Sequence, residues 1–503
     1  MEEKGMEEGE SLLDREEKGR GENSYGNILK RIGAFGGVQV WNILLGLLRG
    51  KFVAILLGPA GMGVSSLYAG ASGTMQQLAG LGLNLAMVKE VAASAPDSLR
   101  RRFVMQICQW LILLTSLLGL LICLLPAPLW SRFTFGDPLH TQGFFWLSAA
   151  VALTVAGNGY LALLQGAGEV KRLSKASVVG GLAGVLFGVP LYYFFGTAGI
   201  VPAMILLALS LFLFYYLSFR RSCSSGEKKQ EKIALTRGRV MPLARRLVST
   251  GLILMVGSLS GTLVSYLINL FVRSQGGVAD VGLFQAANSL TNQYVGMIFS
   301  ALALDYFPRL SAVCRDKDGM REVVNRQTEI VMLIAAPLLI MLIMTTPLVI
   351  RLLLSEEFMV VIPLMRWMGM GMAIQALAFP LGYIYVARDD RKAYLMLEIV
   401  WANVCWISCS VLFYWLYGLV GLGISLVARN IIDIFINVEV CRRRYSFRYS
   451  SGALRATLVS MALVATAFGA SFLPSLPGYA LMGLLTLLSG FYSFRTLRRR
   501  LRG

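Results

Sequence analysis

The sequence has little charge, almost no histidine and no recognisable pattern of paired cysteines. Only 15% of its 503 residues are charged and 56% are hydrophobic, whereas soluble domains carry about 25% charged residues. One histidine, His140, and seven scattered cysteines argue against histidine-based catalysis, a metal cluster or a disulfide framework. We therefore expect a non-enzymatic protein without catalytic residues, metal or cofactor.

Long apolar runs are abundant, and they predict an all-α, polytopic membrane protein with about 14 transmembrane helices. The mean hydropathy is +0.64, and a helix needs about 20 mostly apolar residues to cross the hydrocarbon layer. Runs of this kind lie near residues 32–57, 64–88, 103–125, 143–165, 176–195, 198–219, 247–272, 283–304, 327–350, 363–386, 394–416, 419–440, 454–473 and 478–494.

The basic residues are distributed unequally between the connections. If the N-terminus is cytoplasmic, 40 of the 47 lysines and arginines lie in segments on the cytoplasmic side and three lie in external loops. This bias is the one that sets membrane orientation, so we expect both termini in the cytoplasm. The basic runs are then topology signals that face anionic lipid, and a nucleic-acid partner is not expected.

Loop lengths and composition divide the chain into five parts. The first residues are acidic and have no apolar core, which is typical of a disordered tail, and the longest basic loop falls between the sixth and seventh helices. The predicted parts are a disordered acidic cytoplasmic tail (1–26), a six-helix lobe (27–219), a cytoplasmic linker (220–246), a second six-helix lobe (247–445), and two extra helices with a basic tail (446–503).

A weak internal repeat supports two lobes around a central cavity. Residues 61–68, at the start of the second predicted helix, resemble residues 279–286, at the start of the eighth. Parallel repeats of this kind occur in transporters whose substrate path runs between the repeats. The repeat therefore favours a transporter.

Four basic residues lie within the predicted spans, where each charge costs roughly 2.5 to 3.5 kcal/mol on insertion scales. Arg49 and Lys51 interrupt the first helix, Arg366 lies at the outer end of the tenth, and Arg429 lies near the middle of the twelfth. For the first two, snorkelling to the external interface is the alternative to a buried site, and Arg366 is also interpretable as an interface anchor. Fixed cations in an apolar cleft favour a phosphate or pyrophosphate ligand.

Two acidic residues in the last predicted helices of the second lobe are candidates for ion coupling. Asp433 lies one turn after Arg429 and could instead neutralise it, and Glu398 lies near the inner end of the eleventh helix. Position alone supports either role.

Polar side chains form stripes along several predicted helices. Such residues line a hydrated cavity that admits a glycan, although small and polar residues also serve to pack membrane helices together. The candidates that would line the cavity are Ser65, Ser72, Gln76, Asn269, Gln285, Asn288 and Asn292.

Over about residues 27–445, the order and spacing of several passages resemble those of the Wzx-type polysaccharide flippases. These belong to the multidrug/oligosaccharidyl-lipid/polysaccharide (MOP) exporter superfamily and include the O-antigen and enterobacterial common antigen (lipid III) translocases. Lys51 matches a recurrent lysine of that family, whereas Arg49 does not. The passages that carry the resemblance are 50–54, 58–63, 99–101, 307–311, 321–324 and 381–398.

The resemblance implies a flippase of the bacterial inner membrane. Its substrate would be an undecaprenyl-pyrophosphate-linked oligosaccharide, moved outward by alternating access between two lobes, and its partners would be membrane lipids and other polysaccharide-assembly proteins. Two alternatives stay open. A cation-coupled drug exporter of the same superfamily would want acidic residues in the first lobe's membrane core, which is poor in them, and a glycan polymerase or ligase would want a larger external loop.

Overall fold

The chain is all-helical wherever the structure describes it. A computed structural model describes residues 2–94, 99–224, 237–473 and 475–502, and it describes side chains from Trp41 onward, apart from a few positions. The predicted disordered tail over residues 1–26 lies outside the part whose side chains are described, so that interpretation stays a prediction. No strand occurs among the described residues, which confirms the all-α part of the predicted fold.

Fourteen α-helices and three short helical segments follow one another along the described residues. The short segments are two 3₁₀ turns and one π-helix. In chain order the elements are α1 (Glu2–Gly80), α2 (Leu83–Ala92), α3 (Leu99–Leu124), α4 (Ala127–Phe135), α5 (Thr141–Gly166), α6 (Val170–Phe195), η1 (Gly196–Gly199), α7 (Ile200–Ser224), α8 (Arg237–Val313), α9 (Lys317–Leu353), η2 (Glu356–Val361), α10 (Ile362–Ala387), α11 (Arg391–Ala393), η3 (Tyr394–Trp401), α12 (Ala402–Tyr445), α13 (Ser451–Ala470) and α14 (Ser475–Arg502).

Ten helical stretches among the described residues are long and apolar enough to cross a membrane. This makes the chain a multi-pass membrane protein, but it does not confirm the predicted count of about fourteen. Four of the ten stretches, those over 41–80, 170–222, 240–293 and 391–445, have 40 to 55 residues. Each is about twice the length that one crossing needs.

Glycines break two of these long stretches at equivalent places. Gly58 in α1 has φ 65° and ψ −168°, and Gly277 in α8 has φ 84° and ψ −178°, a region that only glycine enters without strain. Five residues after each break lies a second glycine. A Cβ on Gly63 would collide with the Val278 carbonyl oxygen, and one on Gly282 would collide with the Pro59 carbonyl oxygen. Each helix therefore packs its backbone against the turn of the other.

The other two long stretches share a second pair of equivalent turns. Gly196 (φ 57°) ends α6 and Gly418 (φ 58°) breaks α12. Three residues later, a Cβ on Gly199 would collide with the Leu191 carbonyl oxygen, and one on Gly421 with the Phe413 carbonyl oxygen. The two halves thus repeat the same backbone pattern when they are aligned on these glycine breaks. In this alignment Gly63 is equivalent to Gly282. The sequence repeat, which aligned residues 61–68 with residues 279–286, was therefore displaced by one residue.

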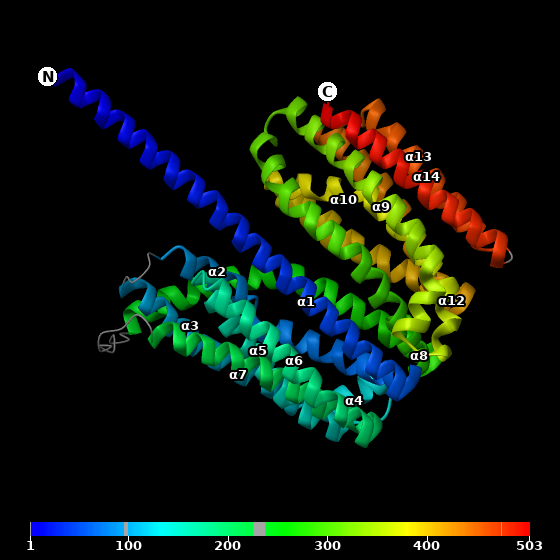
Figure 1. The fold of residues 1–503 in the computed structure, drawn as a ribbon. Helices are drawn as coiled ribbons and strands as arrows, with labels where there is room; N and C mark the ends of the chain where they lie inside the picture. Colours follow the sequence, from blue (N-terminus) through cyan, green and yellow to red (C-terminus); the bar gives the residue numbers. More distant parts are fainter. Residues whose placement is uncertain (1, 95–98, 225–236, 474, 503) are drawn as a thin grey trace.

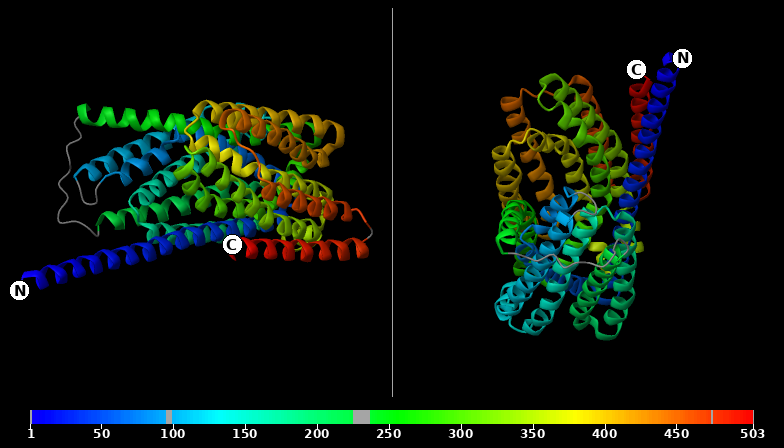
Figure 2. Two further views of the ribbon diagram at one scale, coloured as in Figure 1. Left: turned by 90° about the horizontal axis from the view of Figure 1, so that it is seen from above. Right: turned by 90° about the vertical axis from the view of Figure 1, so that its left-hand side faces the viewer.

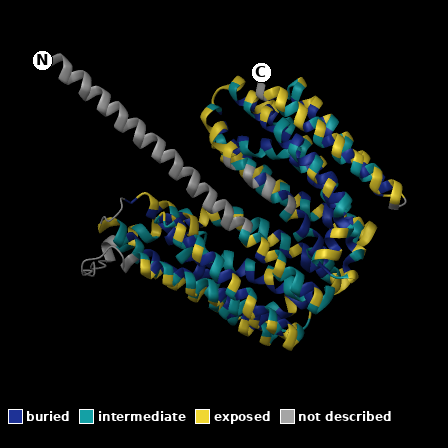
Figure 3. Ribbon diagram, in the orientation of Figure 1, coloured by how far each residue is buried: buried dark blue, intermediate teal, exposed yellow. Residues whose placement is uncertain are grey.

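The buried side chains form one core at one end of the helices and separate cores at the other. The common core includes Val53 of α1, Val281 of α8, Phe358 of η2 and Leu364 of α10. Toward the opposite end, α2, α3, α5, α6 and α7 share one core, whereas α9, α10 and α12 share another. Figure 1 shows the same arrangement, two groups of helices that converge near α4 and the turn of α8, and Figure 3 shows buried residues inside each group. The common core joins the two halves at one end, and the start of α8, through Leu247, also belongs to the core of the first half at the other.

The last two helices pack on the second half through α9. Ser493 of α14 donates to the Leu333 carbonyl (2.6 Å), and Arg500 pairs with Glu329 of α9 (3.2 Å). The Ser450 amide, just before α13, donates to Asn325 (2.7 Å). In both views of Figure 2, α14 lies at the edge of the molecule. These contacts fix the added helices to one half.

The reciprocal glycine contact predicts a large effect from one methyl group. Gly63→Ala is expected to lower the melting temperature of the purified protein, because an added Cβ in a packed interior costs about 1 to 3 kcal/mol. Gly483→Ala in α14 is the matched control, since nothing lies within 4 Å of its added Cβ. The control is expected to be neutral or slightly stabilising. Equal melting temperatures for the two variants would contradict the close contact.

Candidate functional site

Arg49 and Lys51 lie in the helix that leads to the Gly58 turn. The Arg49 Nε donates to the hydroxyl of Tyr192 (3.3 Å), which α6 buries to 2% exposure. Both cations are half-buried, and among the described residues neither has a carboxylate within ion-pair distance. Val53 and Ala54, which follow Phe52, belong to the core that joins the halves. Two uncompensated positive charges therefore lie beside the junction.

Arg429 lies in the second part of α12 and faces the first part of the same element. Its guanidinium stacks on the Trp406 ring, 4.9 Å from the ring centroid, and donates to the Asn430 side chain (3.3 Å). Arg429 and Asp433 form no described ion pair, although the two charges lie close enough to attract each other electrostatically. A cation on an aromatic face gains roughly 0.5 to 2 kcal/mol, which offsets only part of the cost of a charge at membrane depth.

Of the two candidate coupling residues, Asp433 lies one helical turn after Arg429, and Glu398 lies within electrostatic reach of Asp433. Glu398 is in the π-helix η3, and its carboxylate lies against Gly382 of α10, about 3.0 Å from where a Cβ would stand. The Asp433 carbonyl accepts from the Asn437 side chain (3.1 Å). Among the described residues, neither carboxylate forms an ion pair. π-Helices are rare and occur frequently at functional sites.

Arg366 is separate from the other three cations. Its Nη1 donates to the carbonyl of Ser471 (2.7 Å), directly after α13, and it lines a small cavity with residues of α14. No described hydrogen bond or ion pair connects it with Arg49, Lys51 or Arg429. The structure therefore groups Arg366 with the two added helices.

The predicted polar stripes are present but differ in exposure. On helix α1, Gln76 donates to Ser72 (2.7 Å), and Ser72 is only 2% exposed; Ser65 is half-buried. On α8, Asn269 is 4% exposed and its Oδ1 has no partner among the described atoms.

The α8 stripe after the Gly277 break is more accessible. Gln285 donates to Ser289 (3.2 Å), and Asn292 donates to Asn288 (2.7 Å). Gln285 and Asn288 are half-buried and Asn292 is exposed. Ser72 and Asn269 are thus packing residues in this conformation, and the others keep polar atoms at or near a surface.

Sequence reasoning missed a pair of tyrosines at equivalent positions of the repeat. Tyr192 lies four residues before Gly196 and binds Arg49, and Tyr414 lies four residues before Gly418 and donates to Asp280 (2.9 Å). The signal was available in the printed sequence as the same tyrosine-to-glycine spacing in two apolar helices.

A second set of contacts joins α8 to the first half at the other end of the molecule. Ser258 donates to Gln77 (3.1 Å), and Arg246 lies 4.0 Å from Glu90, which also pairs with Arg100 (3.3 Å). Leu247 belongs to the core of the first half. The start of α8 is therefore packed on the helices that precede it, although the sequence assigned residues from 247 onward to the second lobe.

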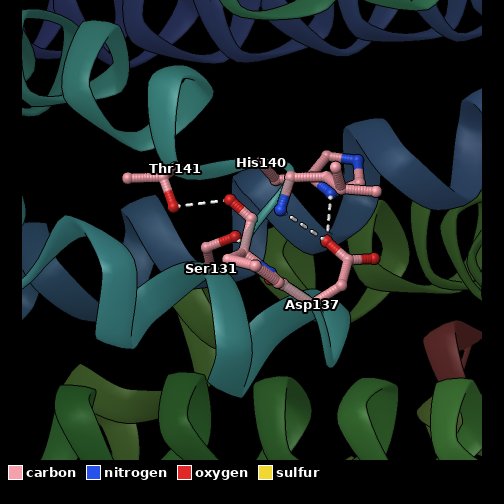
Figure 4. Close-up of polar contacts among 6 residues, drawn as sticks. Ser131, Asp137, His140 and Thr141 are labelled. Carbon is pink, nitrogen blue, oxygen red and sulfur yellow. Dashed lines mark hydrogen bonds and ion pairs between the residues drawn. The ribbon is translucent and has the colours of Figure 1, made fainter.

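His140 belongs to a self-contained polar cluster in the connection between α4 and α5. Its ring nitrogen lies 3.2 Å from the Asp137 carboxylate, and the ring stacks on Phe135 at 3.8 Å. Ser131 donates to the Asp137 carbonyl (2.7 Å) and Thr141 to the Pro138 carbonyl (2.6 Å) (Figure 4). These contacts satisfy one another, which assigns the cluster to folding of the connection.

Comparison with solved structures defines the class of the protein. It superposes on the inward closed conformation of the lipid II flippase MurJ with a TM-score of 0.68 and 13% sequence identity, over 93% of this chain and 99% of that one. It superposes on the inward-facing conformation of a multidrug resistance MATE family transporter of the MOP superfamily with a TM-score of 0.64 and 18% identity, over 80% and 94%. The chain therefore has the same fold as these two proteins.

Sequence comparison then gives the family. The chain belongs to the polysaccharide biosynthesis protein family, whose model matches residues 52–363. It is 25% identical over 367 residues to the lipid III flippase of Escherichia coli (strain K12), covering 70% of this chain and 84% of the relative, and matches the lipid III flippase of Shigella flexneri to the same extent. The predicted resemblance to lipid-linked polysaccharide flippases is confirmed.

The unpaired guanidinium of Arg429 predicts a separation of stability from activity. Arg429→Met removes a half-buried charge that has no carboxylate partner but keeps a side chain able to pack on Trp406. We expect an unchanged or higher melting temperature in a thermal-unfolding measurement, whereas Arg429→Ala, which leaves a void, is expected to melt lower. Arg351→Met at an exposed position is the control. If the methionine variant melts as low as the alanine variant, the charge is compensated within the fold.

Proposed function

We propose that this protein is a flippase that moves an undecaprenyl-pyrophosphate-linked oligosaccharide, such as an O-antigen, common-antigen or capsule repeat unit, across the bacterial inner membrane. One observation carries the proposal: Arg49, Lys51 and Arg429 are membrane-embedded cations without ion-pair partners in a chain similar to lipid III flippases. An uncompensated cation in a low-dielectric site favours binding of an anion, and pyrophosphate is the anion that a lipid-linked sugar carries.

The pyrophosphate contacts we propose are Arg49, Lys51 and Arg429. Two arginines offer forked, bidentate donors, and the lysine offers a mobile point charge. The half-buried or exposed polar side chains Ser65, Gln76, Gln285, Asn288 and Asn292 would contact the glycan, since amide and hydroxyl groups match sugar hydroxyls. Alternating access requires the contacts between the halves to break and re-form.

The membrane topology we propose has fourteen crossings, because each of the four longest helical stretches reverses at its glycine break. In this topology the first lobe (27–219) and the second lobe (247–445) are joined by a linker (220–246), α13 and α14 add two crossings, and both termini lie in the cytoplasm. The basic connections then lie inside, as the bias of lysine and arginine predicts.

The topology is testable with single cysteines in a variant without the native ones. Thr197→Cys and Ala279→Cys, both at exposed positions in glycine turns, are expected to react in whole cells with a membrane-impermeant thiol reagent. Lys392→Cys, at an exposed position at the opposite ends of the helices, is expected to react only after the membrane is permeabilised. Protection of either turn in whole cells would refute the reversal of that helix.

Removing the two neighbouring cations tests the function. Arg49→Ala with Lys51→Ala is expected to reduce flipping at least tenfold, because a hydrogen bond to a charged group is worth about 1.5 to 3 kcal/mol, and to make the undecaprenyl-linked intermediate accumulate. The matched control is Arg49→Lys with Lys51→Arg, which keeps both charges. Normal surface polysaccharide at normal expression of the alanine variant would show that these residues are not the substrate site.

Two further candidate functions are separated by reconstitution. A MATE-type drug exporter shares the fold, and a polymerase would use the same lipid-linked sugar. Purified protein in vesicles is expected to move the lipid-linked sugar without elongating it and without moving a cationic dye.

We propose Glu398 and Asp433 as the coupling residues, and an imposed proton or sodium gradient that leaves the flipping rate unchanged would contradict that role.

A further inference from the structure

A small cavity lies between α10 and the turn that joins α13 to α14. Its volume is about 200 Å³, below the range of about 300 to 1,000 Å³ that holds a drug-sized ligand. It is therefore too small for an oligosaccharide. The polar groups that line it come from Arg366, Ser471 and Tyr479, and its apolar wall comes from Ala470, Leu473 and Met482.

The cation in this cavity is only partly satisfied. The Arg366 guanidinium has five N–H donors; Nη1 donates to the Ser471 carbonyl (2.7 Å), and the Tyr479 side chain is a second hydrogen-bond partner. Its Nε is buried and has no hydrogen-bond partner among the described atoms. No described carboxylate lies within ion-pair distance, and none lines the cavity. The site thus offers positive charge and free donors but nothing that would hold an ammonium group.

The cavity lies at the level of a membrane–water interface. Arg366 is in the second turn of α10, Ser471 directly follows α13, and Tyr479 is in the second turn of α14. Trp367 packs on Phe468 with ring centroids 4.7 Å apart. Tryptophan and tyrosine concentrate at this level of the bilayer, and this end of the helices is opposite the basic tail of α14.

We propose that this cavity binds a phosphate monoanion, carried either by an anionic phospholipid such as phosphatidylglycerol or by free inorganic phosphate. The guanidinium donates to the phosphate oxygens, and the apolar wall accommodates the glycerol and the start of an acyl chain when the phosphate belongs to a lipid. Arg366 is then a lipid or phosphate ligand of the added helices, separate from the pyrophosphate contacts proposed for the substrate.

Thermal stability in detergent tests the site, because a ligand that binds the folded state raises the melting temperature. The wild-type protein is measured with phosphatidylglycerol, with phosphatidylcholine and with inorganic phosphate. We expect phosphatidylglycerol to raise the melting temperature by about 2 °C or more and phosphatidylcholine to have less effect. If inorganic phosphate raises the melting temperature as much as phosphatidylglycerol does, a soluble phosphate is sufficient as the ligand. If inorganic phosphate has no effect, the ligand is the lipid.

Variants are compared by the shift that each anion produces, so that a lower basal stability does not obscure the result. Arg366→Gln is expected to lose the shift, and Arg366→Lys to keep part of it. Arg351→Gln, an exposed arginine at the same end of the neighbouring α9, is expected to keep all of it. A full shift in Arg366→Gln, an equal loss in Arg351→Gln, or no shift with either anion in the wild type would overturn the proposal.

Discussion

The reciprocal packing of two glycine turns is the constraint on which the rest of the structure depends. Gly63 lies against the turn after Gly277, and Gly282 lies against the turn after Gly58. Each contact is so close that an added methyl group would not fit. The common core forms around this contact. A second close backbone contact lies toward the other end, where an added Cβ on Gly82 would collide with the Gly251 carbonyl oxygen and one on Gly251 with the Leu81 carbonyl oxygen. Separation of the halves therefore requires the loss of backbone contacts at one end or the other, and the common core is kept only while the first contact holds.

The charged residues within the membrane follow from this construction. Arg49 and Lys51 lie about two to two and a half helical turns before the Gly58 break, and Arg429 stacks on Trp406, which packs against the same common core. A protein interior normally pairs its buried charges. Here the described structure supplies an aromatic partner to Arg429 and a hydroxyl partner to Arg49, which orient the cations without forming an ion pair.

The sequence was sufficient for the all-helical, membrane-spanning class and for the family resemblance, because hydropathy and the order of motifs are one-dimensional signals; it did not give the ten membrane-competent stretches that the structure shows. It could not distinguish Ser72 and Asn269, which are buried, from Asn292, which is exposed, since all three lie on helical faces with the same polarity. It also could not place Arg366 with α13 and α14, nor show that Arg429 and Asp433 do not pair. Those outcomes depend on contacts between helices distant in sequence.

The two equivalent tyrosines show how a duplicated backbone can diverge in chemistry. Tyr192 holds a guanidinium and Tyr414 holds a carboxylate, yet both stand at the same place before a glycine turn of the same shape. After an ancestral gene duplication, the steric demands on the glycines would persist in both copies, whereas the partner of each tyrosine would be free to change sign. The charge beside each turn can therefore change without altering the glycine geometry that shapes the turn.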